Sequence, residues 1–288
     1  MAENLKLAVQ KKGRLHEKSM QLLKSCGIDI ENFQDRLFVT ASNFNLDILF
    51  LRDDDIPEYV QDNVAHVGIV GENVLLEKGL NVELVKKLGF GKCTLSMGIP
   101  EKLDLKSTSE LENKTIATSY PNILNNYLKE NKISAKVIQI SGSVEIAPTL
   151  GVADYICDLV STGNTLKLNK LKKSFKVLDS QAVLIKSKKL ENDIEINNIF
   201  NKLLVRIESS LNARNSKYIM MNVPKDSLNK IIQIIPSLKS PTILPLSDEG
   251  LYAVHAVIKE DKFWEINEQL KDAGASGILS LPIENIIL

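Results

Sequence analysis

Five consecutive residues that follow an apolar run at 155–160 are of the kinds that bind phosphate. Ser161, Thr162, Gly163, Asn164 and Thr165 combine hydroxyls, a glycine and backbone N–H groups. A loop of this composition between a strand and a helix forms a concave anion site, into which the helix points its positive end. The spacing alone does not separate such a site from an ordinary polar turn.

Two carboxylates, Asp154 and Asp158, lie just upstream of this loop. Carboxylates repel phosphate, so beside a phosphate loop we expect them to face sugar hydroxyls or a bound Mg²⁺. The combination of a phosphate loop with an acidic pair favours a phosphorylated sugar as the ligand.

A basic turn follows the first expected strand, residues 5–10, where open α/β sheets bind ligands. It contains Lys11, Lys12, Gly13 and Arg14. Two lysines and a guanidinium that can bind in a bidentate manner are suited to a polyphosphate. A solvated basic turn is the alternative.

Further polar residues follow other expected strands. Arg52 precedes three aspartates at 53–55, which suit either Mg²⁺ or the start of the next helix. Glu72 follows a buried strand, and Tyr120, after another strand, has a ring that can stack on a base. The three histidines are scattered and pair with no nucleophile, so Ser/His/Asp and zinc hydrolysis lack support.

Alternating strands and helices predict an α/β fold with two lobes and a ligand cleft between them. Residues 1–93 with 180–214 form the expected first lobe, and residues 94–179 the second. The alternation predicts largely parallel sheets. The expected strands are 5–10, 37–41, 46–51, 64–70, 94–99, 115–118, 135–140, 155–160, 175–178 and 182–186. The expected helices are 17–25, 56–62, 123–131, 144–150 and 194–213, with two more that start near 72 and 165.

The last segment, residues 215–288, has a different order of elements. Expected strands at 218–223, 242–246, 251–258 and 277–281 alternate with helices at 226–235 and 263–273. This βαββαβ order is that of the ferredoxin-like fold. Because the segment holds no phosphate loop or candidate nucleophile, we expect a regulatory or oligomerising domain.

Composition excludes several classes of protein. The 288 residues contain 36 Lys+Arg and 36 Asp+Glu, so the balanced charge argues against a nucleic-acid or membrane-surface protein. The first residues show no targeting segment, and no apolar run is long enough to cross a membrane. We therefore expect a cytoplasmic protein.

Nine pieces of the sequence, taken in order, resemble one enzyme family: the long-form ATP phosphoribosyltransferases, which catalyse the first step of histidine biosynthesis. The resemblance covers essentially the whole chain. The pieces are Lys12–Leu15, Arg52–Pro57 (RDDDIP), Gly68–Val74 (GIVGENV), Ala117–Pro121 (ATSYP), Gly142–Pro148 (GSVEIAP), Cys157–Leu166 (CDLVSTGNTL), Ser216–Met221 (SKYIMM), Ser240–Leu246 (SPTILPL) and 273–286.

The resemblance implies a reaction in which N1 of the adenine of ATP attacks C1 of 5-phosphoribosyl 1-pyrophosphate (PRPP). Adenine N1 carries a lone pair, so catalysis would rest on positioning and electrostatics, with no covalent nucleophile and with Mg²⁺ held through the substrate phosphates. The residues that would bind PRPP are Asp154, Asp158 and Ser161–Thr165. Those that would serve ATP and pyrophosphate are Lys11, Lys12, Gly13, Arg14, Arg52, Glu72 and Tyr120.

The resemblance also implies feedback regulation. Histidine would bind in the C-terminal domain, near Ser240, Thr242, Ala275 and Ser276, and shift active dimers towards an inhibited hexamer. Because residues 215–288 are present, we expect no separate regulatory subunit.

Two other classes fit a two-lobed α/β cleft. The two-lobed core we expect is periplasmic-binding-protein-like, and a periplasmic-type solute-binding protein would bind a ligand without chemistry. The absence of a signal peptide and the basic turn argue against that class. A ligand-responsive transcription regulator would need a helix-turn-helix module or a basic face, and neither is visible in the sequence.

Overall fold

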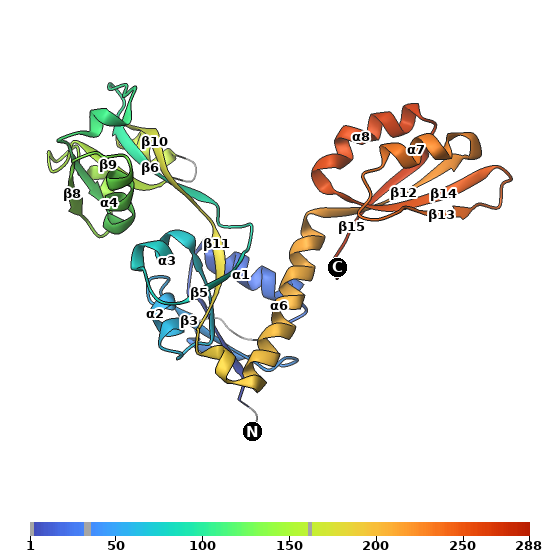
Figure 1. The fold of residues 1–288 in the computed structure, drawn as a ribbon, viewed down its shortest axis with the longest axis horizontal. Coiled ribbons are helices and arrows are strands. Elements are labelled where there is room, and N and C mark those ends of the chain that lie inside the picture. Colours follow the sequence, from blue (N-terminus) through green and yellow to red (C-terminus); the bar gives the residue numbers. More distant parts are fainter. Residues whose placement is uncertain (1–2, 32–35, 161–162) are drawn as a thin grey trace. The chain divides into compact units, whose positions relative to one another are not determined.

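The computed structural model describes residues 3–31, 36–160 and 163–288 (Figure 1). The chain forms two compact units, one of residues 1–21 and 28–199, the other of residues 22–27 and 200–288. These units divide the chain within helix α6 (Ile194–Arg214), so the domain boundaries expected from the sequence stay predictions. None of the helices in the described ranges is long and apolar enough to cross a membrane.

The first unit contains a six-stranded sheet in the order β2-β3-β1-β4-β11-β5. Strand β1 is parallel to β3 and β4, while β2, β11 and β5 run antiparallel to their neighbours. Helices α1 (Arg14–Ser25), α2 (Ile56–Gln61) and α3 (Glu72–Lys78) follow strands β1, β3 and β4 in the chain. The strands are β1 (Leu5–Gln10), β2 (Phe38–Thr40), β3 (Leu46–Leu51), β4 (Val67–Gly71), β5 (Glu83–Lys87) and β11 (Ala182–Lys186).

A second, five-stranded sheet of the same unit has the order β10-β6-β9-β7-β8. Strands β7, β8 and β9 are parallel neighbours, whereas β6 is antiparallel to both β9 and β10. Helices α4 (Pro121–Glu130) and α5 (Asn164–Leu168) follow β7 and β9. The strands are β6 (Cys93–Pro100), β7 (Thr115–Thr118), β8 (Lys136–Gln139), β9 (Tyr155–Val160) and β10 (Leu171–Ser180).

The expectation of largely parallel sheets was wrong, because both sheets are mixed. The chain enters the second sheet through β6, which runs against the parallel strands of that sheet, and it returns to the first sheet through β11, which runs against β4. Strand β10 is antiparallel to β6 and therefore runs in the same direction as β7, β8 and β9. The expected helix at 144–150 was also wrong, since only one 3-10 turn forms at Val144–Ile146. Pro148 has no N–H with which to extend that turn.

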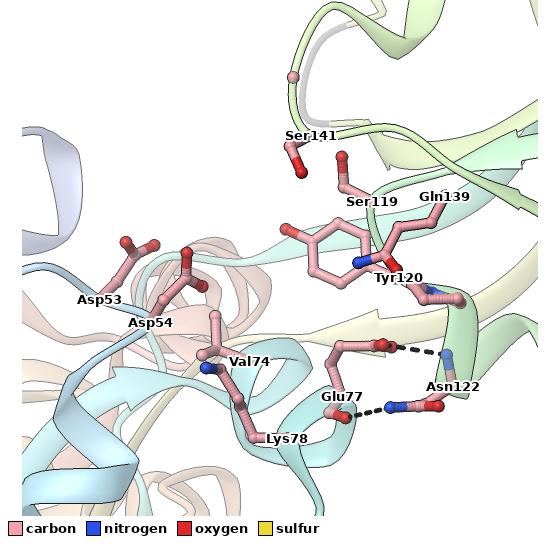
Figure 2. A pocket seen from close by; sticks show the side chains of 12 residues that line it. Asp53, Asp54, Val74, Glu77, Lys78, Ser119, Tyr120, Asn122, Gln139 and Ser141 are labelled. Carbon is pink, nitrogen blue, oxygen red and sulfur yellow. Dashed lines mark hydrogen bonds between the residues drawn. The ribbon is translucent and has the colours of Figure 1, made fainter.

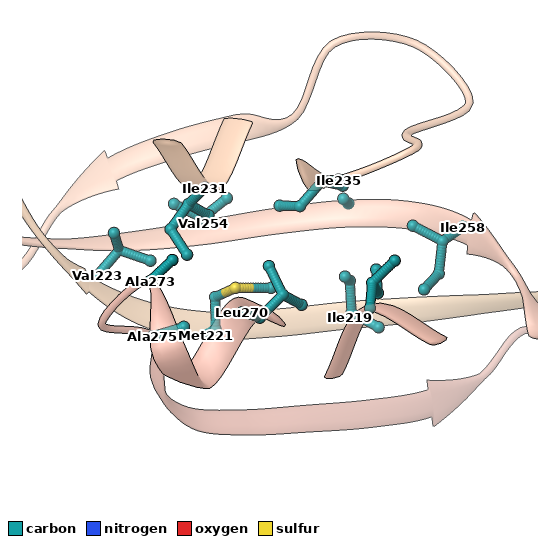
Figure 3. Packing of buried hydrophobic residues seen from close by; sticks show 12 residues of the cluster. Ile219, Met221, Val223, Ile231, Ile235, Val254, Ile258, Leu270, Ala273 and Ala275 are labelled. Atoms are coloured by element: carbon teal, nitrogen blue, oxygen red, sulfur yellow. The ribbon is translucent and has the colours of Figure 1, made fainter. Parts of the chain in front are cut away.

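The C-terminal fold is ferredoxin-like, as the sequence predicts. Strands β12 (Ser216–Pro224), β13 (Thr242–Pro245), β14 (Leu251–Lys259) and β15 (Ser276–Pro282) form an antiparallel sheet in the order β13-β14-β12-β15. Alternate residues of β12, among them Ile219 and Met221, pack against Ile231 of helix α7 (Leu228–Ile234) and Leu270 of α8 (Glu260–Asp272), as Figure 3 shows. This domain therefore has a hydrophobic core of its own.

Close packing at Gly68 ties strand β4 to helix α2, which begins just after Asp53–Asp55. A Cβ at Gly68 would lie 2.7 Å from Ile56 Cγ2 and 3.0 Å from Val60 Cγ2. We predict that Gly68→Ala lowers the free energy of unfolding by about 1–3 kcal/mol through overpacking. Ile56→Ala should relieve the clash, so denaturant titrations should show the double variant to be more stable than the sum of the single effects. Additive losses would contradict this packing.

Candidate functional site

A pocket of about 680 Å³ in the first unit is lined by segments of both sheets (Figure 2). One wall consists of Asp53 and Asp54, which follow β3, and of residues of α3. The other wall consists of residues that follow β7 and β8. The full lining is Asp53, Asp54, Val74, Glu77, Lys78, Ser119, Tyr120, Pro121, Asn122, Gln139, Ser141 and Gly142.

The topology explains why these residues meet. β3, β7 and β8 are all members of parallel pairs, and the residues beyond their carboxyl ends line the pocket. Ligands of open α/β sheets bind at such carboxyl ends. Short polar residues after the strands leave backbone groups accessible, so the pocket can offer many hydrogen bonds.

Negative charge gathers around the phenol of Tyr120. Burial and the neighbouring carboxylate of Asp54 raise the pKa of Asp53 above its ordinary value. Burial, and then the charges of Asp158, Asp53 and Asp54, raise the pKa of Tyr120. The Tyr120 hydroxyl therefore stays neutral and accepts a hydrogen bond of 3.2 Å from Asn73 Nδ2. A planar ring among carboxylates suits a flat ligand that gains positive charge.

The expected phosphate loop follows β9, and part of it can be described. Gly163 has a φ of +79°, which favours glycine, and helix α5 begins at Asn164, close to where the sequence predicts it. Asn164 and Thr165 are exposed. Ser161 and Thr162 lie outside the described residues. With five residues, α5 has a weak dipole, so backbone N–H groups and hydroxyls would supply most of the anion binding.

The structure separates the two aspartates that the sequence places together. Asp158 lies near the carboxyl end of β9, where its Oδ1 accepts a bond of 2.8 Å from Leu159 N–H, and burial raises its pKa. Asp154 precedes β9, and its Oδ2 accepts a bond of 2.8 Å from Thr115 N–H. A strand rises about 3.3 Å per residue, so six residues place Asp154 about 20 Å from the loop. The expectation that Asp154 faces the same sugar as the loop therefore conflicts with the geometry.

The basic turn and Arg52 do meet at one sheet edge. Lys11 N–H donates to Leu51 O at 2.7 Å, and this bond brings the exposed turn of Lys11, Lys12, Gly13 and Arg14 beside Arg52. None of these five residues lines the 680 Å³ pocket. They form a basic rim at the carboxyl ends of β1 and β3.

Glu72 lies at a different hollow of about 340 Å³. One of its oxygens pairs with Lys87 Nζ at 2.8 Å, while Oε2 is buried and has no hydrogen-bond partner within the described part of the chain. Among the residues expected to serve ATP and pyrophosphate, Tyr120 alone lines the larger pocket.

The residues expected to bind histidine are spread over the C-terminal sheet. Thr242 is on the edge strand β13 and Ser276 on the opposite edge strand β15, with two strands between them. Ala275 is buried, and its N–H already donates to Leu270 O. Ser240 precedes β13 and is exposed. Within one chain these residues do not form a single site.

Several pocket residues were not predicted. No sequence pattern around Glu77, Lys78 and Gln139 indicates a binding site, because only the tertiary structure brings α3 and the end of β8 to this pocket. The sequence did indicate Asp53 and Asp54, since the run of three aspartates after β3 suits Mg²⁺ or the start of a helix. Over residues 3–31, 36–160 and 163–288 there is no group of three or more His, Cys, Asp or Glu side chains that could hold a metal ion.

Comparisons with known proteins point to one family. A family model described as ATP phosphoribosyltransferase matches residues 52–209, and one described as HisG, C-terminal domain, matches residues 213–285. ATP phosphoribosyltransferase of Cytophaga hutchinsonii is 49% identical over 287 residues, which is 100% of both chains. That of Bacteroides thetaiotaomicron is 47% identical over 284 residues, covering 99% of this chain and 100% of the relative.

A solved structure agrees with these sequence matches. A chain of the ATP phosphoribosyl transferase (HisG:HisZ) complex from Thermotoga maritima matches with a TM-score of 0.58 and 28% identity. The match covers 71% of this chain and 98% of that chain.

The raised pKa of Asp158 generates a prediction about stability. A carboxyl with a higher pKa in the folded than in the unfolded chain loses stability as pH rises through that interval. Asp158→Asn removes this penalty, so we expect a higher Tm than wild type at pH 7. The difference should narrow as the pH falls towards about 4, where the unfolded-state carboxyl also binds a proton.

Asp154→Asn is the matched control, because its amide oxygen can still accept the Thr115 N–H bond. Its Tm should stay close to that of wild type over the same pH range. An Asp158→Asn protein less stable than wild type at pH 7 would show that this carboxylate supports the fold instead.

Proposed function

The chain belongs to the long-form ATP phosphoribosyltransferase family, and on that premise we propose which of its residues carry the reaction. The enzyme joins N1 of the adenine of ATP to C1 of PRPP and releases pyrophosphate, the first step of histidine biosynthesis. The observation that carries this assignment is 49% identity over the whole chain.

In our proposal, ATP binds in the 680 Å³ pocket with its adenine against Tyr120. The attacking N1 uses its own lone pair, so no general base is required. As the bond forms, positive charge develops on both the adenine and the ribose. The charges of Asp53 and Asp158 both raise the pKa of Tyr120, so these carboxylates lie near its ring. They would stabilise the developing positive charge in a site where burial strengthens electrostatic interactions.

For PRPP we propose the loop at the carboxyl end of β9. Ser161, Thr162, Gly163, Asn164 and Thr165 would bind the 5-phosphate, and Asp158 would accept hydrogen bonds from the ribose hydroxyls. We leave Asp154 out of this group, since its carboxylate is bonded to Thr115 N–H. The basic rim of Lys11, Lys12, Gly13, Arg14 and Arg52 would attract the pyrophosphate end. Glu72, which lines the hollow of about 340 Å³, would also serve ATP and pyrophosphate.

The donor set also fits Mg²⁺ that arrives with substrate phosphates. Asp53 and Asp54 are adjacent carboxylates in a pocket proposed to hold a triphosphate, and burial disfavours the charged form of Asp53. Asp53 and Asp54 would hold the cation, and its charge would relieve both repulsions. When bound, Mg²⁺ would neutralise the leaving pyrophosphate. The two aspartates would orient that cation.

An assay of product formation tests the reaction and excludes a protein that only binds ligands. Purified protein with ATP, PRPP and Mg²⁺ should change the adenine absorbance as N1 is alkylated. Gly163→Val forces a branched side chain into a left-handed backbone, and Thr162→Ala removes a hydroxyl donor. We expect each to raise the KM for PRPP by about tenfold or more, the loss of a charge-assisted bond being worth about 1.5–3 kcal/mol. Wild-type PRPP kinetics in both would contradict the loop assignment.

We also propose that residues 215–288 bind histidine between two subunits. Thr242 and Ser276 lie on opposite edges of the C-terminal sheet, so a site that uses both needs a second copy of the chain. Such a site would couple histidine binding to the change from dimer to hexamer, because a ligand shifts an equilibrium through its different affinity for the two states. A separate regulatory subunit would not be required. A cytoplasmic location follows from the use of ATP and PRPP.

This arrangement predicts the pattern of inhibition. Histidine should inhibit without competing with PRPP and should increase the sedimentation coefficient of the protein. Thr242→Ala should weaken inhibition by about three- to tenfold, the scale of one lost hydrogen bond, and leave the KM for PRPP unchanged. Strictly PRPP-competitive inhibition would refute the proposal.

A further inference from the structure

Helix α4 begins at the pocket, but its own sequence does not cap it. Tyr120, the residue at its N-cap, makes no side-chain capping bond, and the first turn has no acidic residue. The first N–H groups of a helix have no partner within the helix, so another group must satisfy them.

Glu77 supplies that cap (Figure 2). It lies on helix α3, which follows strand β4 of the first sheet, whereas α4 follows strand β7 of the second. Its Oε1 accepts a bond of 2.9 Å from Asn122 N–H, which Figure 2 shows. Its Oε2 accepts one of 3.0 Å from Ile123 N–H. A carboxylate at this position also interacts favourably with the positive end of the helix.

The capping is reciprocal. Asn122 Nδ2 donates a bond of 2.9 Å to the backbone carbonyl of Glu77, which is one of the last carbonyls of α3. The carboxyl end of α3 and the amino end of α4 are therefore joined by three hydrogen bonds. Each helix supplies the partner that the other lacks.

Tyr120 is held from a second side by the same helix. Asn73 lies one turn before Glu77 on α3, and its Nδ2 donates to Tyr120 Oη. Ser180 Oγ donates to Asn73 Oδ1 at 2.8 Å, and Asn73 N–H donates to Ser180 Oγ at 3.0 Å. Both Asn73 and Ser180 are buried, so the amide cannot turn without the loss of several bonds.

We propose that Glu77 is a positioning residue for the nucleotide: it fixes the start of α4 and thereby holds the Tyr120 ring in the orientation that accepts adenine. The proposal rests on the ATP site proposed above. Glu77 does not touch the reacting atoms; it acts through Tyr120. The affinity for PRPP, whose proposed loop follows β9, does not depend on it.

The test is calorimetric titration of ATP and, separately, of PRPP into the full chain. Glu77→Gln keeps the shape but loses the charge and one acceptor. It should weaken ATP binding by about three- to tenfold, the scale of a hydrogen bond to a charged group, and leave the Kd of PRPP unchanged. Glu130→Gln, which removes the same charge from the exposed last residue of α4, is the matched control and should bind ATP like wild type.

A Tyr120→Ala background separates positioning from a general effect. If Glu77 acts through Tyr120, Glu77→Gln should change the ATP Kd little in that background. If Glu77→Gln does not fold, Asn122→Ala removes the reciprocal bond alone and should weaken ATP binding in the same selective way.

Three results would overturn the inference: an unchanged ATP Kd in Glu77→Gln, an equal loss of ATP and PRPP affinity, or additive effects of Glu77→Gln and Tyr120→Ala. Failure of the proposed ATP site is a distinct outcome, because Tyr120→Ala alone would then leave the Kd of ATP unchanged.

Discussion

A single residue, Gln181, separates the last strand of the second sheet, β10, from strand β11 of the first. The chain changes sheets here without a turn of its own, and on the outward path it changes sheets within residues 88–92. Two short connections leave the pocket walls on separate sheets. Side-chain contacts must then fix the distance between these walls, and the buried pair of Ser180 and Asn73 lies directly beside the return passage.

The carboxylates near Tyr120 show a conflict between stability and the proposed function. Asp53 and Asp158 are partly buried, and burial raises the pKa of each, so the fold bears a cost for keeping them ionised. Hydrogen bonds from the backbone N–H groups of Asp53 and Asp54 offset only part of that cost for Asp53, since its pKa is still raised. In the proposed reaction positive charge develops on two rings, and these carboxylates would stabilise it.

The sequence predicted most elements of this fold because their signals are local. The bounds of β1, β3, β7, β9 and β11 agree with the prediction, since each contains a group of apolar residues between polar turns. Strand β5 was missed because Glu83–Lys87 is an edge strand with exposed charges. Strand direction was also missed, as periodicity says which residues are buried but not which neighbour a strand will pair with.

The site was predicted less completely, for related reasons. Tyr120 was found because it follows a strand. Glu77 was missed because the groups that it caps lie 45 and 46 residues further along the chain. Asp154 was misplaced because four positions in a strand separate side chains by more than 10 Å, at about 3.3 Å per residue. Residue type thus indicated a chemistry, while the tertiary structure decides which of these residues lie together.

A crystal structure of the protein with bound ATP tests the central claim most directly. Our account predicts density for adenine against the ring of Tyr120, between the Asp53–Asp54 wall and the start of α4. Adenine density outside this pocket, for example in the hollow of about 420 Å³ that Asp154 and Tyr155 help to line, would contradict it.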